Sequence, residues 1–531
     1  MALAWYNVAN HNGSTQLYLR SIDRFEATPI PGTEGADGPF FSPDGQSVGF
    51  FAGGKLKRVS LSGGAPSTLC SAPLSRGASW APDDSIILAS GTLGLYRVSA
   101  AGGTPKPLTV LDRKKGEFSH RWPEILPGGK EVLFTIWAGN IFNWDYNRIG
   151  VLSLRTGERR VLLEGGTYAR YVPSGHLVYA RAGGLLAVPF DLKRLEVTGP
   201  PVSIVQGVSI SRNLGVAQFS FSGDGSFAYV PGGPSEDNRT LLWVDRTGTS
   251  RPLEAPPRAY GSPRLSPDGQ RLAVAIYSTP GLWLYDLARG TLTRLTESVG
   301  APIWTPDGRY VTFGSLESGV LNLYRIPADG SGAAERLTTS ENAQWPGSWS
   351  PDGQVLAFSG VDLTTGYDIW MLGLQGDRKP RPFLQTPANE SGPIFSPDGH
   401  WLAYLSDESG RQEIYVRPFP GPGGKTQIST EGGTEPMWAR NGRELFYRNG
   451  DKMMVTAVET QPVFAASKPK LLFEAHYETS YNAFVRAYDV SPDGQRFLMV
   501  KGSEQESAPT QLNVVLNWSD ELRRLAPAGK P

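Results

Sequence analysis

Three short stretches of this sequence spell motifs of known chemistry, but none has the surroundings that the chemistry needs. Residues 45–49 read Gly-Gln-Ser-Val-Gly, the spelling of a nucleophile elbow, whose serine sits between a strand and a helix. Apolar residues follow Ser47, so we expect it to open a β-strand. Residues 423–426 (Gly-Gly-Lys-Thr) resemble the end of a phosphate loop, but Phe419 stands where its first glycine belongs. Residues 120–122 lack the aspartate of a kinase catalytic loop. We therefore expect no enzyme activity.

Repeated carboxylates are the other chemical feature, and their spacing explains them. Each follows a proline and precedes a glycine in the same short pattern, at Asp44, Asp268, Asp307, Asp352 and Asp398. Aspartate in such a position accepts hydrogen bonds from the backbone of a turn, so we expect turn capping. The five histidines show no paired metal spacing, and Cys70 is the only cysteine. The sequence therefore predicts no metal site, no cofactor and no disulfide.

The element that carries these aspartates is a strand, a tight turn and a second strand. Residues 349–353 (Trp-Ser-Pro-Asp-Gly) precede the apolar run at 355–358. Proline presets the backbone angle of the turn, and glycine takes the positive φ that other residues adopt only at a cost. The pattern recurs, intact or degraded, at residues 41–45, 80–83, 126–129, 172–175, 221–225, 265–269, 304–308, 349–353, 395–399, 438–442 and 490–494. A truncated unit precedes the first of these, which makes twelve units.

Twelve units about 40 residues apart predict an all-β protein of twelve four-stranded blades. Because single rings usually hold 4–8 blades, two tandem six-bladed β-propellers are favoured. Similar tails at 195–205 and 464–473 lie six units apart, which supports six plus six; seven plus five stays open. We expect the first propeller over residues 1–257, with its first blade truncated. The second is expected over 258–531, ending in a short helix with Ser519 as its N-cap.

Charge and hydropathy exclude some classes of binding partner. Lys and Arg together number 51, as do Asp and Glu, so the net charge is +0 and no nucleic-acid binding is expected. No run of 18 apolar residues and no signal-peptide pattern occurs in the sequence, so we expect no membrane insertion by this chain. The expected location is cytoplasmic by default, and the expected state is a monomer.

The repeat resembles the TolB-type, WD-like β-propeller family, whose units carry the same Ser-Pro-Asp-Gly turn. A narrower resemblance involves residues 32–36 (Gly-Thr-Glu-Gly-Ala), 53–56 (Gly-Gly-Lys-Leu), 119–123 (Ser-His-Arg-Trp-Pro) and 514–518 (Val-Val-Leu-Asn-Trp). These are similar to the C-terminal, sensor-like region of bacterial membrane Ser/Thr protein kinases. That resemblance implies a kinase domain and a membrane helix upstream, with the propeller outside the cytoplasm. Neither is in this sequence.

Function in a propeller usually lies at loops and at the mouth of the central channel. The loops that lead into the innermost strands supply our candidates. In the first ring these are Arg76, His120, Arg121, Tyr168, Arg170 and Gln218; in the second they are Tyr260, Arg264, Gln344, Trp345, Asn389, Glu435 and Arg486. The arginines of the first ring suit an anionic or carboxylate-bearing partner.

The sequence therefore favours a non-enzymatic binding or sensing module that takes a protein, a peptide or a small anionic ligand. The leading hypothesis is the sensor region of a bacterial signalling kinase. Two alternatives remain. One is a propeller accessory to a prolyl-oligopeptidase-like hydrolase, and the other is a free-standing periplasmic scaffold of the TolB type.

Overall fold

The computed structural model places most of the chain in two compact units. The first comprises residues 1–235 and 506–531, and the second comprises residues 236–505. The structure describes residues 2–7, 15–21, 26–72, 75–91, 93–112, 115–138, 146–211, 214–223, 225–232, 238–298, 300–362, 365–479, 485–502 and 511–527.

The first unit is built from six antiparallel sheets. Its elements are β1 (Ala2–Asn7), β2 (Gln16–Ser21), β3 (Thr28–Pro29), β4 (Asp37–Phe41), β5 (Ser47–Ala52), β6 (Lys55–Ser60), β7 (Ser67–Ser71), β8 (Ser75–Trp80), β9 (Ser85–Ser90), β10 (Leu95–Ser99), β11 (Lys106–Pro107), β12 (Ser119–Ile125), β13 (Glu131–Trp137), β14 (Arg148–Ser153), β15 (Arg159–Glu164), β16 (Thr167–Val172), β17 (His176–Arg181), β18 (Gly184–Asp191), β19 (Glu196–Val197), β20 (Val202–Gln206), β21 (Phe219–Phe221), β22 (Phe227–Tyr229), β48 (Asn513–Val515) and the helix α1 (Trp518–Leu525).

The second unit also contains six antiparallel sheets. Its strands are β23 (Thr240–Asp245), β24 (Ser250–Pro252), β25 (Tyr260–Leu265), β26 (Arg271–Ile276), β27 (Gly281–Asp286), β28 (Thr291–Thr296), β29 (Ile303–Trp304), β30 (Tyr310–Ser315), β31 (Asn322–Pro327), β32 (Glu335–Arg336), β33 (Gln344–Trp349), β34 (Val355–Asp362), β35 (Gly366–Gly373), β36 (Arg381–Leu384), β37 (Glu390–Phe395), β38 (Trp401–Ser406), β39 (Glu413–Pro418), β40 (Thr426–Gln427), β41 (Thr434–Trp438), β42 (Glu444–Asn449), β43 (Lys452–Glu459), β44 (Ala465–Ala466), β45 (Lys470–Glu474), β46 (Tyr488–Val490) and β47 (Arg496–Lys501).

These sheets confirm the all-β propeller architecture that the repeat predicts. Most blades are four consecutive strands in sequence order, such as β25-β26-β27-β28. The truncated first blade is the three-stranded sheet β1-β2-β3. The two similar tails form additional strands: β19 and β20 pair with β18, and β44 and β45 pair with β43. Each of these five-stranded blades is the fifth of its unit.

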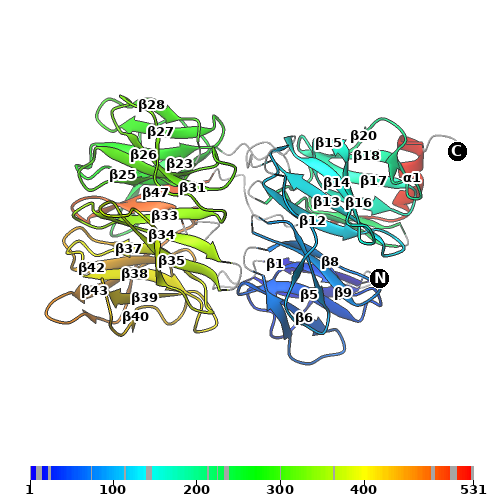
Figure 1. The fold of residues 1–531 in the computed structure, drawn as a ribbon, viewed down its shortest axis with the longest axis horizontal. Helices are drawn as coiled ribbons and strands as arrows, with labels where there is room; N and C mark the ends of the chain where they lie inside the picture. The colour runs from blue at the N-terminus through cyan, green and yellow to red at the C-terminus, as the bar shows by residue number, and fades with distance from the viewer. Residues whose placement is uncertain are drawn as a thin grey trace. The chain divides into compact units, whose positions relative to one another are not determined.

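The two units are nested rather than consecutive, and this differs from the expected boundary at residue 257. The last blade of the first unit starts with β21 and β22, but its third strand is β48, near the end of the chain. Strands β23 and β24 instead join β47 and β46 in one sheet of the second unit. In Figure 1, orange β47 lies among the green strands β23 and β25.

Ring closure explains why the chain crosses in this way. When strands from the beginning and the end of residues 236–505 pair in one sheet, fewer strand edges stay unpaired than when the last sheet consists of the hairpin β46-β47 alone. Thr240 of β23 pairs with Lys501 of β47, and Asp245 pairs with Arg496. The run Leu-Leu-Trp-Val at residues 241–244 suits the third strand of either blade, so the sequence pattern alone did not distinguish the partners.

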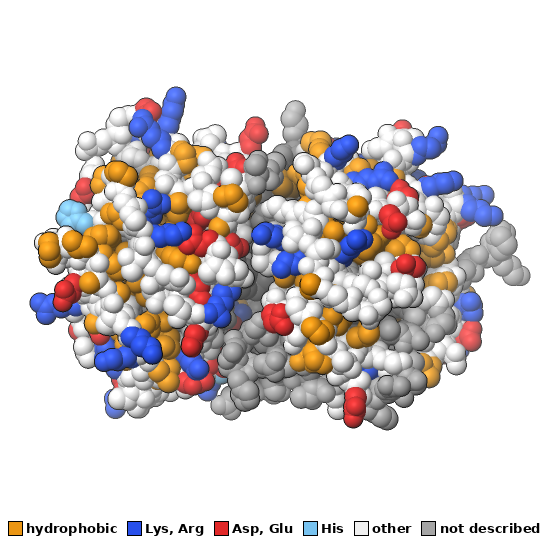
Figure 2. Space-filling view, turned by 90° about the horizontal axis from the view of Figure 1, so that it is seen from below, with side chains coloured by type: hydrophobic (Ala, Val, Ile, Leu, Met, Phe, Trp, Pro, Cys, Tyr) orange, Lys and Arg blue, Asp and Glu red, His pale blue; other side chains and the backbone are white. Residues whose placement is uncertain are grey.

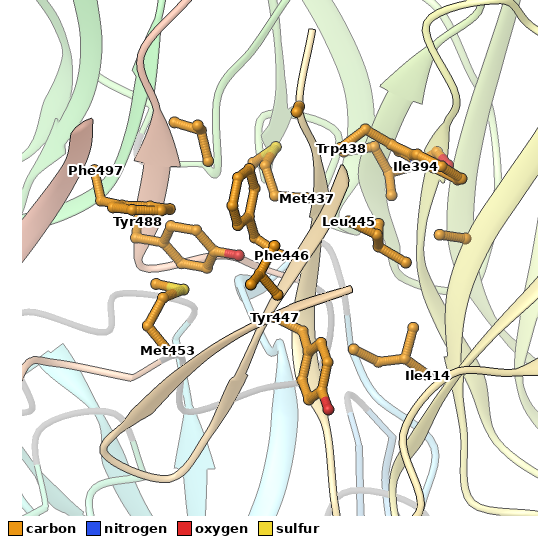
Figure 3. Packing of buried hydrophobic residues seen from close by; sticks show 14 of the residues in the cluster. Ile394, Ile414, Met437, Trp438, Leu445, Phe446, Tyr447, Met453, Tyr488 and Phe497 are labelled. Carbon is orange, nitrogen blue, oxygen red and sulfur yellow. The ribbon is translucent and has the colours of Figure 1, made fainter. Parts of the chain in front are cut away.

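A hydrophobic cluster packs the closing blade against its neighbour. The rings of Phe446 and Phe497 lie 5.1 Å apart at an interplanar angle of 87°. Figure 3 shows Tyr488 and Phe497 on one side of Phe446, with Leu445 and Trp438 on the other. Strand β23 adds its own buried side chains, Leu242 and Val244, to the same cluster. The first and last parts of the second unit therefore share one core.

The repeated turn works as its composition predicts. Ser350 Oγ donates to Asp352 Oδ1 at 2.5 Å, and Asp352 Oδ1 also accepts from Gln354 N at 3.0 Å. Val355 N in turn donates to Ser350 Oγ at 2.9 Å. Gly353 has φ 69°, the left-handed conformation that favours glycine. The same hydrogen bonds recur around Asp44, Asp268, Asp307, Asp398 and Asp493, whereas Asp224 of a degraded turn lies outside the described residues.

The tryptophans before these turns pack between blades. Trp349 Nε1 donates to Thr312 Oγ1 of the preceding blade at 3.0 Å, and Trp304 Nε1 donates to the Arg264 carbonyl at 2.9 Å. Both tryptophans are buried. Both tryptophans therefore pack between adjacent blades.

Helix α1 closes the last blade of the first unit. Trp518 stacks on Phe221 and lies 4.8 Å from Phe227, and Figure 1 places α1 beside β17, β18 and β20. The expected N-cap was wrong: Asn517, with φ 55° and no side-chain cap, precedes the helix, and Ser519 lies inside it. The left-handed turn at Asn517 lets Trp518 N donate to the Gly225 carbonyl.

Candidate functional site

A β-bulge interrupts the innermost strand of most blades, and the candidate residues cluster at it. The pairing register shifts between Ser75 and Ala78, between Arg121 and Glu124, and between Thr434 and Met437, among others. Bulges re-aim side chains and are common beside functional sites. The residues with positive φ at the bulges are Gly38, Gly77, Trp122, Tyr168, Ser262, Gly392 and Glu435. Four of these are not glycine, so backbone strain is concentrated at the same level of both units.

In the first unit, Arg121 of β12 is almost completely buried, with 2% of its surface exposed. Its Nε donates to Ser119 Oγ at 2.7 Å, and its Nη1 lies 3.4 Å from the Leu214 carbonyl. The guanidinium stacks 3.5 Å above the Trp137 ring. Burial lowers the pKa of Arg121 well below its usual range, and the nearby charge of Arg76 adds to this effect. No carboxylate among the described residues forms an ion pair with Arg121.

Arg76 of β8 lies close to Arg121 but has an acid nearby. Its Nη1 donates to the Ser75 carbonyl at 2.7 Å. Ser75 Oγ donates to both oxygens of Asp37, at 2.9 and 3.1 Å. Burial raises the pKa of Asp37, while Ser75 and the charge of Arg76 oppose that increase. Asp37 is therefore available to balance Arg76, and the charge of Arg121 remains unbalanced.

Arg170 of β16 has its own counter-ion. Its Nε lies 3.1 Å from Glu124 Oε2, and its guanidinium lies 3.8 Å from the ring centroid of Tyr168. Burial opposes the charge of Arg170, but Tyr168 and Glu124 still raise its pKa above the ordinary value. The three predicted arginines of this unit therefore differ: Arg170 is neutralised within the fold, and Arg121 is not.

His120 and Gln344 belong to a structural clamp rather than to an open mouth. His120 is fully buried, and its Nδ1 lies 2.7 Å from Thr109 Oγ1, which also accepts from Leu95 N. Gln344 sits at the equivalent place, where Thr338 Oγ1 donates to its Oε1 at 2.5 Å. In both blades a threonine hydroxyl after the fourth strand, Thr109 or Thr338, bonds to a backbone N–H of the third strand. The same hydroxyl also bonds to the side chain at the start of the next blade.

In the second unit, the predicted residues Glu435 and Arg486 meet near the ring centre. Arg486 Nη2 donates to the Gly347 carbonyl at 2.8 Å, which lies on β33, three blades away from β46. Glu435 Oε2 accepts from Ala487 N at 2.7 Å. Burial, followed by the charge of Arg264, lowers the pKa of Arg486 to about 9. The Arg486 side chain therefore connects two blades that lie three positions apart in the ring.

Arg264 completes this group. Its Nη1 and Nη2 donate to the carbonyls of Tyr488 and Arg486, each at 3.0 Å. Asp489 accepts from Leu265 N at 2.6 Å. Asp489 and Glu435 both raise the pKa of Arg264, although burial lowers it further. Two arginines and two carboxylates therefore balance one another in this unit.

The remaining candidates lie apart from these groups. Trp345 is half-buried with its ring 6.1 Å from that of Tyr367, and Asn389 Nδ2 donates to Asp407 Oδ2 at 2.7 Å. Tyr260 Oη donates to the Pro256 carbonyl at 2.7 Å. Gln218 is half-buried ahead of β21, and its backbone pairs with Ser209 and Val230.

The discarded motifs occupy ordinary positions. Ser47 opens β5, where its backbone N–H donates to Ser42 Oγ at 2.9 Å. Lys425 of the Gly-Gly-Lys-Thr stretch lies in a hairpin loop before β40 and pairs with Glu408. Among the described residues, no group of three or more His, Cys, Asp or Glu side chains could hold a metal ion, and no helix is long and apolar enough to span a membrane.

Surface charge offers no further site on the face that Figure 2 shows. Lys and Arg side chains alternate there with Asp and Glu, without a large patch of one sign. This agrees with the net charge of +0.

Sequence reasoning missed several residues at the same level of the blades. Trp122 adopts φ 54° at the bulge, and Glu124 is the counter-ion of Arg170. Asp368 and Glu390 are buried acids of the second unit. The sequence could have predicted Glu390 as a candidate, because Glu390 stands six residues before the turn residue Ser396. The candidate Gln344 stands six residues before the turn residue Ser350 in the same way. Trp122 carries no sequence signal of its unusual backbone.

The chain is similar to known proteins with a TolB-type β-propeller. Residues 218–363 match the TolB β-propeller domain family. Similar curated proteins include the Tol-Pal system protein TolB of Francisella tularensis, 27% identical over 30% of this chain and 37% of that protein. The TolB homolog of Chlorobium luteolum is 34% identical over 18% of this chain and 23% of that protein. These matches support a TolB-like β-propeller.

Two further comparisons cover more of the chain. An uncharacterized protein of Agrobacterium fabrum is 27% identical over 35% of this chain and 63% of its own length. The chain thus spans less than two thirds of each of these curated relatives. A solved structure assigned as TolB from Agrobacterium tumefaciens aligns with 50% of this chain and 98% of its own, at 19% identity and a TM-score of 0.43.

Proposed function

We propose that this TolB-like chain is a non-catalytic binding propeller whose first unit receives an anionic group of a protein, peptide or small molecule at Arg121. The observation that carries the proposal is the burial of Arg121 without a carboxylate partner among the described residues. A buried, unpaired guanidinium is costly, so its retention has to be offset. An anionic ligand offsets it directly.

Arg76 and the aromatic rings define how the anion binds. Arg76 brings a second guanidinium close enough to lower the pKa of Arg121 further. A carboxylate or phosphate that bridges the two would relieve that repulsion and form charge-assisted hydrogen bonds. Trp137 already covers one face of the Arg121 guanidinium, which leaves its edge for the ligand.

Paired arginine variants test this proposal. A panel of carboxylates, phosphates and peptides with free C-termini should include ligands that raise the melting temperature of the full chain. For any such ligand, Arg121→Gln should weaken binding at least tenfold, measured by calorimetry. Arg170→Gln is the matched control and should change affinity less than twofold, because Glu124 already neutralises Arg170. Equal losses for both variants, or no anion-dependent stabilisation at all, would contradict the proposal.

The biological setting belongs to the same proposal. We favour the sensor region of a signalling kinase because of the residue stretches that resemble those of membrane Ser/Thr kinases. The TolB-like matches equally suit a free-standing scaffold that binds proteins. The genomic sequence upstream of Met1 distinguishes them: an in-frame kinase domain and membrane helix support the sensor, and a stop codon supports the scaffold.

A further inference from the structure

One blade of the second unit carries a buried pair of acids where its neighbour carries amides. In the blade β29–β32, Asn322, Thr338 and Gln344 form the clamp, and Thr338 Oγ1 donates to Gln344 Oε1. Asn322 Nδ2 lies 3.2 Å from each of three acceptors, including the Ser340 carbonyl. This clamp is neutral and well bonded.

The next blade, β33–β36, has Asp368 and Glu390 at the equivalent positions. Asp368 directly precedes Ile369, which pairs with Leu384, just as Asn322 precedes Leu323 in its own blade. Glu390 opens β37 six residues before its turn serine, as Gln344 does in β33. Because the amide version folds into the same blade geometry, the fold itself does not require acids at these places.

Consecutive residues, Gln385 and Thr386, donate one hydrogen bond to each of the two carboxyls. Gln385 Nε2 donates to Asp368 Oδ2 at 3.1 Å, and Thr386 Oγ1 donates to Glu390 Oε1. Thr365 Oγ1 adds a second donor to Asp368 Oδ2, at 2.8 Å. The other oxygen of each carboxyl, Asp368 Oδ1 and Glu390 Oε2, is buried with no hydrogen-bond donor.

No basic group compensates these acids among the described residues. Asp368 is 0% exposed and Glu390 is 1% exposed, and neither forms an ion pair. The charged groups that act on them are also acidic: Asp362 on Asp368, and Asp407 together with Asp368 on Glu390. Two buried carboxyl oxygens without donors therefore face a surplus of negative charge.

We propose that a divalent cation of the Ca²⁺ type binds between Asp368 and Glu390, with the unpartnered oxygens Asp368 Oδ1 and Glu390 Oε2 as its anionic ligands. A doubly charged ion balances two carboxylates. The two proposed ligands are carboxyl oxygens, and histidine and cysteine are absent from the named contacts, which favours a hard cation over Zn²⁺. Ca²⁺ accepts irregular protein oxygens, whereas Mg²⁺ retains several waters that this buried place would not hold.

Calcium binding to the full chain tests the proposal. We expect apo protein at pH 8 to bind one Ca²⁺ per chain more than the Asp368→Asn/Glu390→Gln double variant, measured against a fluorescent chelator. Ca²⁺ should also raise the melting temperature of the wild type, and Mg²⁺ should bind at least tenfold more weakly. The double variant reproduces the amides of the neighbouring clamp, so it should fold, and the single Glu390→Gln variant should lose the same Ca²⁺ ion.

Asp352→Asn is the matched control, because Asp352 is an exposed turn acid of the same unit and should not affect Ca²⁺ stoichiometry. Unchanged stoichiometry in the double variant would overturn the proposal. The proposal would also be overturned if the melting temperature of the wild type changed with pH but not with Ca²⁺. In that case protons alone would neutralise Asp368 and Glu390.

Discussion

At the residue scale, the same side-chain type serves different ends according to its partner. The turn aspartates accept hydrogen bonds and lie exposed, and the Ser350 hydroxyl lowers the pKa of Asp352. Asp368 and Glu390 have the opposite environment, because burial raises their pKa values to about 6 and about 7. The turn aspartates and the buried pair Asp368 and Glu390 all occupy positions that recur from blade to blade. Only the neighbours differ.

The buried pair predicts a stability that falls with rising pH in the absence of Ca²⁺. The ordinary pKa values are 3.8 for Asp368 and 4.5 for Glu390, so the unfolded chain releases these protons before the folded chain does. The contribution of this pair to stability should be highest below about pH 4, fall between about pH 4 and 7, and level off above, since the proton linkage of the pair vanishes outside that window. A shift of about two pKa units corresponds to about 3 kcal/mol.

Urea unfolding of the second unit at pH 5 and pH 8 in chelator measures this difference. The Asp368→Asn/Glu390→Gln variant should show a smaller decrease between the two pH values. A wild type that is more stable at pH 8 than at pH 5 would contradict the prediction.

A turn substitution offers a second test at this scale. Asp352→Ala removes the acceptor of two hydrogen bonds, from Ser350 and Gln354, and should lower the free energy of unfolding by about 1 kcal/mol. Asp352→Asn keeps an acceptor oxygen and should cost less. Equal losses would mean that charge, rather than hydrogen bonding, stabilises the turn.

At the element scale, the sequence predicted the blades well because every blade except the truncated first carries its own turn signal. The Ser-Pro-Asp-Gly turn marks where the first two strands of a blade meet. The tryptophan before the turn marks the side of the strand that packs against the preceding blade. The bulge before each turn had no comparable signal at Trp122 or Tyr168, where a large residue adopts positive φ. Several candidates lie at these bulges, and whether each has a counter-ion depends on buried partners such as Glu124, which pairs with Arg170.

Helix α1 makes a prediction about the first unit. Trp518 is buried against Phe221 and Phe227, so Trp518→Ala should leave a cavity and cost about 3–5 kcal/mol. Arg523→Ala, on the exposed side of the same helix, should change stability by less than about 0.5 kcal/mol. Limited proteolysis that follows fragments of each unit would show whether the loss is confined to the first. A loss shared equally with Arg523→Ala would contradict the packing role.

At the scale of the whole molecule, sequence spacing could count the blades but could not assign the strands at the crossings. Among the described residues, the sheet β21-β22-β48 and the sheet β24-β23-β47-β46 each combine strands from distant parts of the chain. Pairing between strands far apart in the chain depends on which closure leaves the fewest free edges. That is a property of the assembled ring rather than of any local stretch.

Expression of fragments tests the nested arrangement. A fragment of residues 236–505 contains both halves of the closing blade and should unfold cooperatively on heating. A fragment of residues 258–531 lacks β23 and β24 and should not, because β47 then has an unpaired edge. Near-ultraviolet circular dichroism of the two fragments makes the comparison. Cooperative folding of the second fragment alone would favour consecutive rings.

The insertion between β22 and β48 also sets an entropic condition on the first unit. These two strands pair directly, Tyr229 with Asn513, although about 280 residues separate them. Once Thr240 and Lys501 are paired, only about 20 residues of chain remain between this pair and the pair Tyr229–Asn513. Loop-closure entropy makes the longer closure more costly by about 2 kcal/mol. Folding of the second unit therefore lowers the entropic cost of pairing β22 with β48, and a ligand or ion that stabilises the folded second unit should also favour this pairing.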